Sequence, residues 1–224
     1  MRSQVALIVG AGPGISAAFG EALVADGYQV ALASRNVEKL SPLATKMNAK
    51  AFEADASSPA SLVRLFGEVD RGLGEPEVVL FNPSARVRGN LLSLNIEEAS
   101  ASIQTTAIGA LVTAQEAARR MLPKGRGSIF FTGATAGVKG FARSSVFAMG
   151  KFAVRGLAQS LARELGPQGI HVVHFVIDGG VVQGSQDPGV LSPRAIAQSY
   201  MAALAQPAGA WSWELELRSH IEPF

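Results

Sequence analysis

Three glycines stand close together near the start of the chain, in residues 10–16, which read Gly-Ala-Gly-Pro-Gly-Ile-Ser. A short apolar run precedes them and an apolar helical pattern follows. Glycine lets the backbone turn tightly and approach a pyrophosphate, and the N-terminus of a helix favours an anion. The pattern predicts a phosphate-binding turn made by Gly10, Gly12, Gly14 and Ile15; a tight turn without a ligand is the alternative.

The residues after the second apolar run, 29–33, indicate which dinucleotide the turn would bind. Dinucleotide sites selective for NAD place a carboxylate here, where it binds the ribose 2′-hydroxyl. This chain instead has Ser34, Arg35 and Asn36. Arg35 can bind a 2′-phosphate through charge-assisted hydrogen bonds, whereas a carboxylate would repel one. We therefore expect NADP(H) in preference to NAD(H), the alternative being that Arg35 is a solvated loop cation.

A second group of residues with chemical potential is 145–151, which reads Ser-Val-Phe-Ala-Met-Gly-Lys and places Lys151 one helical turn beyond Phe147. Further landmarks are Met-Leu-Pro at 121–123, Gly-Ser-Ile at 127–129 and Leu-Gly-Pro-Gln-Gly-Ile-His-Val at 165–172. Together with the glycine turn, these features resemble the short-chain dehydrogenases/reductases over about residues 4 to 183. The chain looks like a divergent subgroup that lacks the catalytic tyrosine and serine.

The resemblance implies a catalytic group of Asn, Ser, Tyr and Lys, of which only the lysine remains, as Lys151. Thr106 stands in the asparagine place, Ala134 in the serine place and Phe147 in the tyrosine place. A phenyl ring cannot give or take the proton that accompanies hydride transfer. A methyl group cannot hydrogen-bond a substrate carbonyl. Of the two family roles of the lysine, binding the nicotinamide ribose survives.

The same resemblance implies further cofactor contacts. Asp55 and its neighbour Ala56 would contact adenine, and Asn82 is what remains of the family's Asn-Ala-Gly turn. Val181 would offer backbone groups to the nicotinamide carboxamide. Ser16 replaces the last glycine of the family's glycine turn, and its small size favours a retained fit.

Strand-like and helix-like patterns alternate along the chain, and the strand-like runs are apolar on both faces, as buried parallel strands are. This alternation predicts a doubly wound α/β (Rossmann) fold with a mostly parallel seven-stranded sheet and helices on both faces. We expect one domain over residues 1–224, with a short substrate loop near 183–194. The predicted strands are 5–9, 29–33, 50–54, 78–81, 128–132, 171–177 and 211–218.

Composition narrows the range of partners. Of the 224 residues, 48% are hydrophobic, and the formal net charge is only +2, so neither disorder nor nucleic-acid binding is expected. The chain has no cysteine, which excludes disulfides and thiol chemistry. No apolar run is long enough to predict a membrane span.

His171 and His174 lack acidic partners in sequence, so we expect no metal site. For Tyr200, helix packing is favoured over catalysis.

We therefore expect an NADP(H)-binding oxidoreductase of the short-chain dehydrogenase/reductase type, transferring hydride between nicotinamide and a small carbonyl or alcohol. The alternative is a catalytically inactive nucleotide-binding protein that acts as a sensor or scaffold subunit. The resemblance also implies a homodimer or homotetramer, and we expect the protein in the cytoplasm.

Overall fold

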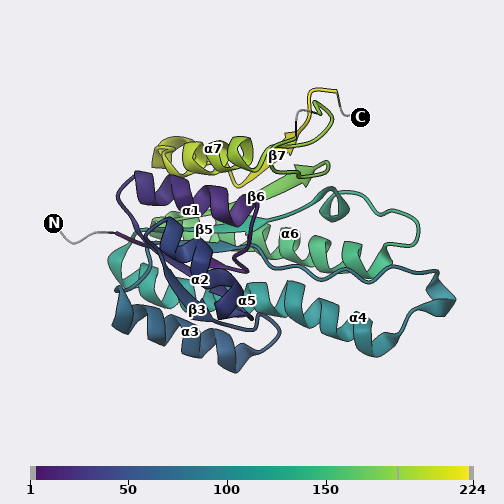
Figure 1. The fold of residues 1–224 in the computed structure, drawn as a ribbon, viewed down its shortest axis with the longest axis horizontal. Coiled ribbons are helices and arrows are strands. Elements are labelled where there is room, and N and C mark those ends of the chain that lie inside the picture. Colours follow the sequence, from purple (N-terminus) through teal and green to yellow (C-terminus); the bar gives the residue numbers. More distant parts are fainter. Residues whose placement is uncertain (1–3, 186, 222–224) are drawn as a thin grey trace.

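The computed structural model describes residues 4–185 and 187–221, and within them the chain forms one parallel sheet flanked by helices (Figure 1). The strand order is β3-β2-β1-β4-β5-β6-β7, and each neighbouring pair is parallel. The strands are β1 (Val5–Val9), β2 (Gln29–Ser34), β3 (Lys50–Glu53), β4 (Val78–Phe81), β5 (Gly127–Thr132), β6 (Ile170–Asp178) and β7 (Glu214–Arg218). The order reverses at β1, and ligands of such sheets bind beyond the carboxyl ends of the strands at this point.

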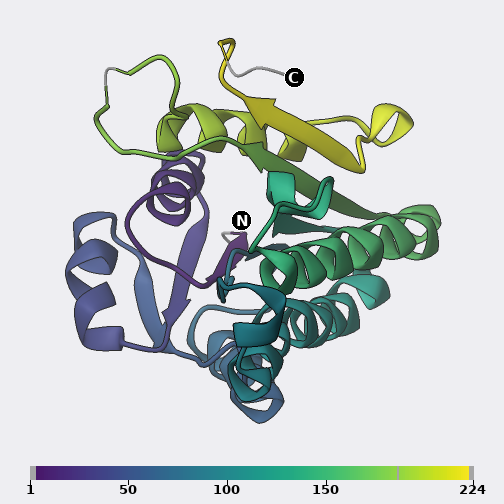
Figure 2. The same cartoon turned by 90° about the vertical axis from the view of Figure 1, so that its right-hand side faces the viewer.

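Helices cover both faces of the sheet, because the strands are buried and need apolar cover on either side. In Figure 2, α1 and α7 lie on one side and α6 on the other. One core joins the sheet to α3, α5 and α6, and the other joins it to α1, α2 and α7. The helices are α1 (Ile15–Ala25), α2 (Val37–Lys46), α3 (Pro59–Gly72), α4 (Ile96–Ile103), α5 (Gly109–Met121), α6 (Ser145–Leu165) and α7 (Pro193–Leu204).

The predicted fold class is confirmed, and the sheet is parallel throughout its described strands. The strand bounds agree to within about one residue except in β7, which begins at Glu214 rather than at residue 211. Trp211 directly follows a short 3-10 turn (Ala208–Ala210) and does not join the strand; its ring stacks on His171 with centroids 4.7 Å apart. Its indole N–H donates to the carbonyl of Gln206 at 3.1 Å. No helix among the described residues has the length and apolarity needed to cross a bilayer.

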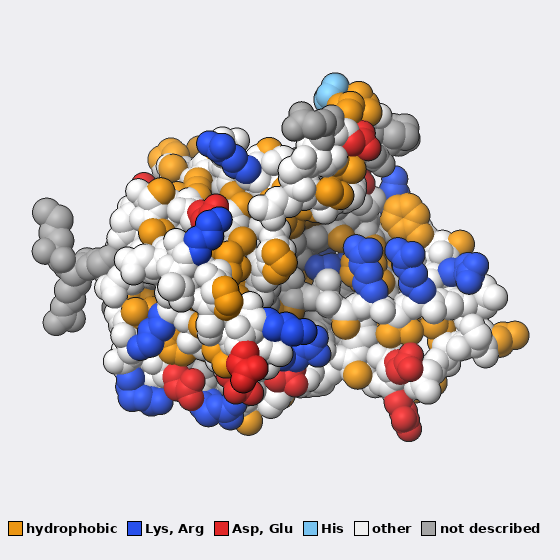
Figure 3. Space-filling view, in the orientation of Figure 1, with side chains coloured by type: hydrophobic (Ala, Val, Ile, Leu, Met, Phe, Trp, Pro, Cys, Tyr) orange, Lys and Arg blue, Asp and Glu red, His pale blue; other side chains and the backbone are white. Residues whose placement is uncertain are grey.

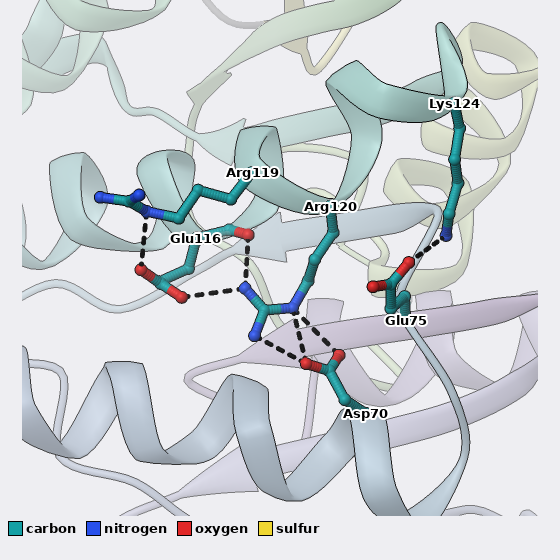
Figure 4. Close-up of polar contacts among 6 residues, drawn as sticks. All are labelled: Asp70, Glu75, Glu116, Arg119, Arg120 and Lys124. Atoms are coloured by element: carbon teal, nitrogen blue, oxygen red, sulfur yellow. Dashed lines mark hydrogen bonds and ion pairs between the residues drawn. The ribbon is translucent and has the colours of Figure 1, made fainter.

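A cluster of ion pairs fastens α5 to α3 (Figure 4). The guanidinium of Arg120 binds both carboxylate oxygens of Asp70, at 2.7 to 3.0 Å, and also the carboxylate of Glu116 at 2.9 Å. Lys124 pairs with Glu75 at 2.8 Å. Bidentate pairing of this kind is the strong form of a carboxylate–arginine contact. It fixes the C-terminal half of α5, whose other end leads into the candidate site.

A π-helical turn, Gln104–Ile108, joins α4 to α5 without a loop. Such turns hold one residue more than a regular helical turn and are frequent at functional sites. Thr106 lies in this turn and is buried. The turn therefore decides which way a residue of the expected catalytic group faces.

Candidate active site

The glycine turn after β1 is tied to both neighbouring strands. The backbone N–H groups of Gly10 and Ala11 donate to the carbonyl of Ala33, at 2.9 and 2.8 Å. The carbonyl of Gly10 accepts from the hydroxyl of Ser16 and from the side-chain amide of Asn82, both at 3.2 Å. The hydroxyl of Ser16 thus adds a bond that closes the turn.

Backbone conformation explains why glycine stands at two of these positions. Gly10 has φ +77°, and a Cβ there would lie 2.6 Å from Cγ of Pro83. Gly14, directly before α1, has φ +110°. A Cβ on Gly12 or Gly14 would meet open space. That space is a cavity of about 490 Å³, lined by Gly10, Gly12, Pro13, Gly14, Ile15, Ser16, Asn82, Val181, Gln183 and Pro193.

The predicted residues after β2 lie at the carboxyl edge of the sheet. Ser34 ends β2, and its hydroxyl donates to the carbonyl of Asn36 at 3.1 Å. The side-chain oxygen of Asn36 caps α2 by accepting from the N–H of Lys39 at 2.9 Å. Arg35 is exposed between them. Asn36 therefore has a structural task, while the guanidinium of Arg35 faces solvent.

Asp55 and Ala56 follow the adjacent strand β3. The carboxylate of Asp55 accepts from the N–H of Ser57 at 2.9 Å and from its hydroxyl at 2.7 Å. These bonds, with a smaller contribution from the charge of Arg35, lower the pKa of Asp55. A Cβ on Gly109 would lie 2.4 Å from the carbonyl oxygen of Ala56, so this loop packs directly on the start of α5.

Lys151 is buried inside α6, and its ammonium donates to the carbonyl of Thr132 at 2.7 Å. Burial, with a smaller contribution from the charge of Arg86, lowers the pKa of Lys151 to about 7. Phe147, one turn earlier, is also buried, and the guanidinium carbon of Arg86 lies 4.3 Å from the centre of its ring. We call Thr106, Ala134, Phe147 and Lys151 the catalytic corner.

Thr106 reaches this corner through Gly150, the residue before Lys151. A Cβ on Gly150 would lie 3.1 Å from Cγ2 of Thr106, so the two helices touch here. The hydroxyl oxygen of Thr106 accepts from the backbone N–H of Ala85 at 3.2 Å. The structure thus brings the four residues to one place and gives Thr106 a contact with the loop after β4.

A second cavity, of about 640 Å³, lies beside the corner, and we call it the arginine pocket. Sequence reasoning missed its three arginines, because the loops that carry them have no periodicity; the Arg-x-Arg spacing after β4 was the available signal. Its lining residues are Arg86, Arg88, Ala134, Thr135, Ala136, Phe141, Ala142, Arg143, Ser144, Phe147, Ile177, Asp178 and Gly179.

Asp178, at the end of β6, supplies a carboxylate to the arginine pocket. The hydroxyl of Thr135 donates to it at 2.5 Å, and Arg218 pairs with it at 3.5 Å. This contact joins the helical turn after β5, which carries Thr135, to the end of β6, and no local sequence pattern relates the two side chains. The carboxylate is therefore already partnered from two sides.

Three other polar side chains are held inside the fold. Tyr200 is fully buried, with its hydroxyl 3.1 Å from that of Thr132, and burial raises its pKa. His174 is fully buried, with Nδ1 3.0 Å from the carboxylate of Glu214. Burial lowers the pKa of His174 to about 4, although Glu214 opposes the shift. His171 stacks on Trp211. These positions fit packing rather than proton transfer.

The predicted substrate loop follows Val181, which forms an isolated parallel bridge with Leu191. The N–H of Leu191 donates to the carbonyl of Gly180 at 2.7 Å. Residue 186 of the predicted 183–194 loop lies outside the described residues. Helix α7 begins at Pro193, so the last two residues of the predicted loop are helical. We call the cavity beside the glycine turn the nucleotide cavity, and Gln183 and Pro193 of this loop contribute to its lining.

Residues 4–185 match the family model described as short chain dehydrogenase. The chain belongs to the short-chain dehydrogenase family. It is thereby an oxidoreductase of the short-chain dehydrogenase type, with the fold that binds nicotinamide cofactors. Both cavities lie at the carboxyl ends of the strands, where ligands of open parallel sheets bind.

Solved structures and curated proteins agree with this assignment. A short-chain dehydrogenase from Rhodopseudomonas palustris is 33% identical, with a TM-score of 0.87 over 97% of this chain and 99% of that one. Sorbitol-6-phosphate 2-dehydrogenase of Escherichia coli (strain K12) is 28% identical over 81% of this chain and 73% of its own length. An uncharacterized oxidoreductase of Staphylococcus aureus (strain USA300) is 26% identical over 92% and 93%.

Proposed function

We propose that the protein is an NADP(H)-dependent oxidoreductase that transfers hydride between nicotinamide and a small carbonyl or alcohol compound. The observation that carries the proposal is the cavity at the glycine turn, together with Arg35 at the end of β2. The cofactor would be held by the residues predicted above: Gly10, Gly12, Gly14, Ile15, Ser34, Arg35, Asn36, Asp55, Ala56, Asn82, Lys151 and Val181.

The residues present fit a dinucleotide. A Cβ on Gly12 or Gly14 would project into the open space that a pyrophosphate would occupy at the start of α1. At the end of β2, Ser34 stands where NAD-selective sites have a carboxylate, and the exposed guanidinium of Arg35 is free of ion pairs among the described residues. These features favour a 2′-phosphate and therefore NADP(H) over NAD(H).

When bound, the nicotinamide ring would supply or accept the hydride. Lys151 would hydrogen-bond the nicotinamide ribose through its amine, which is part of the catalytic corner. Phe147 and Ala134 can neither hold nor move a proton. The hydroxyl of Thr106 retains its proton for donation, because its oxygen already accepts from Ala85. We infer that the proton for the substrate oxygen comes from water.

The competing hypothesis is a nucleotide-binding protein without turnover, acting as a sensor or scaffold subunit. The observation that favours it is the wall of the arginine pocket, where the side chains of Phe147 and Ala134 carry no polar group. Cofactor-dependent conversion of any carbonyl or alcohol by the unmodified protein would exclude this hypothesis. Nucleotide binding alone would be consistent with both.

We also propose that the protein forms a homodimer or homotetramer through the faces of α5 and α6. Ile108 directly before α5, Leu111 on α5, and Met149 and Phe152 on α6 expose between 37% and 61% of their surface. We propose that these exposed apolar side chains contribute to the association surface. Light scattering should give the mass of two or four chains, and replacing Met149 and Phe152 with Asp should give single chains.

We further propose that residues 1–224 form one domain, with its substrate loop near 183–194, and that the protein is located in the cytoplasm. Limited proteolysis should give no stable fragment smaller than the whole chain. Cell fractionation should recover the protein with cytoplasmic markers. Separate stable fragments would show more than one domain.

Calorimetric titration with NADPH and, separately, with NADH tests the cofactor. We expect Arg35→Gln to weaken NADPH binding by about 10- to 100-fold and to leave NADH binding unchanged, because only NADPH carries the phosphate that Arg35 would bind. Lys39→Gln, which removes a neighbouring exposed cation from α2, is the matched control and should change neither affinity. Absence of binding for both nucleotides would refute the proposed function.

A further inference from the structure

Three arginines converge on the pocket beside the catalytic corner. Arg86 and Arg88 come from the loop after β4, and Arg143 comes from the loop before α6. The N–H of Gly89 donates to the carbonyl of Arg143 at 3.2 Å, which ties the two loops together. In Figure 3, Lys and Arg side chains gather beside the central hollow of this face.

The loop that carries Arg86 is held in place by two hydrogen bonds directly before the arginine. Ala85, the preceding residue, donates its N–H to the hydroxyl of Thr106 at 3.2 Å and accepts from the hydroxyl of Ser102 at 2.9 Å. Both hydroxyls are on buried residues. The backbone at Ala85 is therefore fixed from both sides, and Arg86 leaves this fixed point to lie over the ring of Phe147. The residue in the family's asparagine place thus positions an arginine.

The positive charge of the pocket is not balanced within the described part of the chain. Arg86, Arg88 and Arg143 take part in none of the ion pairs there, unlike Arg120, which pairs with Asp70 and Glu116 (Figure 4). The carboxylate of the pocket, Asp178, is occupied by Arg218 and Thr135. The charge of Arg86 also disfavours the charged form of Lys151. An anion in the pocket would relieve these repulsions.

The position of Arg86 relative to the catalytic corner indicates where such an anion would bind. The guanidinium of Arg86 lies 4.3 Å from the ring of Phe147, and both Phe147 and Ala134 form the wall of the same pocket. An oxyanion held by guanidinium groups would therefore place the carbon atoms next to it at the catalytic corner. A planar guanidinium binds carboxylate and phosphate oxygens in pairs, which also orients the ligand.

We propose that Arg86, Arg88 and Arg143 bind the anionic group of the substrate, a small carbonyl or alcohol compound that bears a carboxylate or a phosphate. That the bound anion is a substrate rests on the proposed oxidoreductase function. Anion binding by the three arginines does not depend on turnover. The pocket volume of about 640 Å³ accommodates a small metabolite.

Equilibrium binding of two charged alcohols and their neutral counterparts tests the proposal. The probes are glycerol 3-phosphate with glycerol, and malate with malate dimethyl ester, each titrated into the full-length protein by calorimetry. We expect at least one charged probe to bind at least about tenfold more tightly than its neutral counterpart, and the pair that shows this identifies phosphate or carboxylate as the preferred group. Equal binding within both pairs, or no binding of any probe, would overturn the proposal.

Variants locate the site. Arg86→Gln, Arg88→Gln and Arg143→Gln should each weaken binding of the preferred charged probe by about tenfold or more, whereas Arg163→Gln, an exposed arginine remote from the pocket on α6, should not. Unchanged affinity in the three pocket variants would place the anion elsewhere and overturn the proposal. All four replace exposed side chains, and thermal unfolding checks that each variant folds.

NADPH titration of the same samples separates the two proposals. Anion binding without NADPH binding would refute the proposed function and leave the anion site standing. NADPH binding without discrimination between charged and neutral probes would refute the anion site and leave the proposed function standing. The pocket shares no lining residue with the nucleotide cavity, so the pocket variants should keep the NADPH affinity of the unmodified protein.

Discussion

The glycine turn after β1 and the catalytic corner beside β5 and α6 lie at the same edge of one sheet, but different parts of the chain fix their geometry. At the turn, positive φ values and backbone hydrogen bonds set the shape, and the hydroxyl of Ser16 adds a further bond. At the corner, any proton transfer depends on side chains, and those of Phe147 and Ala134 carry no group that gives or takes a proton. Nucleotide binding that depends on backbone shape should therefore tolerate more sequence divergence than chemistry that depends on side chains.

The largest expected effect comes from restoring the corner. Phe147→Tyr combined with Ala134→Ser adds the proton donor and the carbonyl partner that the family uses, and such proton transfer contributes roughly 10²–10⁴-fold to rate. We expect cofactor-dependent turnover of a suitable carbonyl compound to rise by about 10³-fold over the unmodified protein. Single-turnover kinetics with NADPH measures this. Unchanged turnover with intact NADPH binding would show that more than these two groups is missing.

The next effect comes from disturbing the turn. Gly10→Ala places a Cβ 2.6 Å from Cγ of Pro83 at a φ of +77°. We expect a loss of about 2–3 kcal/mol in stability and a matching loss of NADPH affinity. Gly156→Ala, inside α6 with nothing near the new Cβ, is the control and should be neutral or stabilising by up to about 1 kcal/mol. Chemical denaturation and calorimetry give both quantities, and equal behaviour of the two variants would contradict a backbone-determined turn.

A smaller effect comes from the buried amine of the corner. The pKa of Lys151 is about 7 in the folded chain and near 10.5 in the unfolded one. Between these values the unfolded chain holds a proton that the folded chain lacks, so stability rises with pH across this window. We expect the unmodified protein to gain up to about 1.4 kcal/mol per pH unit relative to Lys151→Met.

Denaturant unfolding of the two proteins at pH 7, 8 and 9 would show this slope. Lys39→Met removes an exposed lysine of α2 and should leave the slope as it is in the unmodified protein. Parallel curves for the unmodified protein and Lys151→Met would mean that Lys151 stays charged inside the fold.

The smallest effect concerns Ser16. Ser16→Ala removes the hydroxyl that donates to the carbonyl of Gly10, and Asn82 still satisfies that carbonyl. We expect a cost of about 1 kcal/mol in thermal stability and less than about a threefold change in NADPH affinity. Ser41→Ala, which removes a comparable but exposed bond on α2, should change stability by less. A larger loss of NADPH affinity would mean that the Ser16 hydroxyl contacts the nucleotide itself.

Much of the fold could be predicted because its signals are local. Buried strands leave short apolar runs, and the glycine turn is marked by positions where only glycine fits, such as Gly10. The polar contacts around the site could not be predicted, because they join residues far apart in the chain. Thr135, in the turn after β5, meets Asp178 at the end of β6, and Ala85 meets Thr106 and Ser102 across a loop and a helix turn. Alternation at 211–218 predicted too long a strand, since an alternating pattern does not mark where pairing begins: Trp211 stacks on His171, and pairing with β6 starts at Glu214.

The π-helical turn at Gln104–Ile108 makes chain length, and not only residue type, matter in this part of the protein. A deletion of one residue there would restore a regular helix and turn α4 by about 100° about its axis relative to α5. Ser102 and Thr106 would no longer face Ala85 together, and the loop that carries Arg86 would lose its anchor. Relatives that lack this extra residue would therefore be expected to hold the loop differently and to select other substrates, even where every arginine is retained.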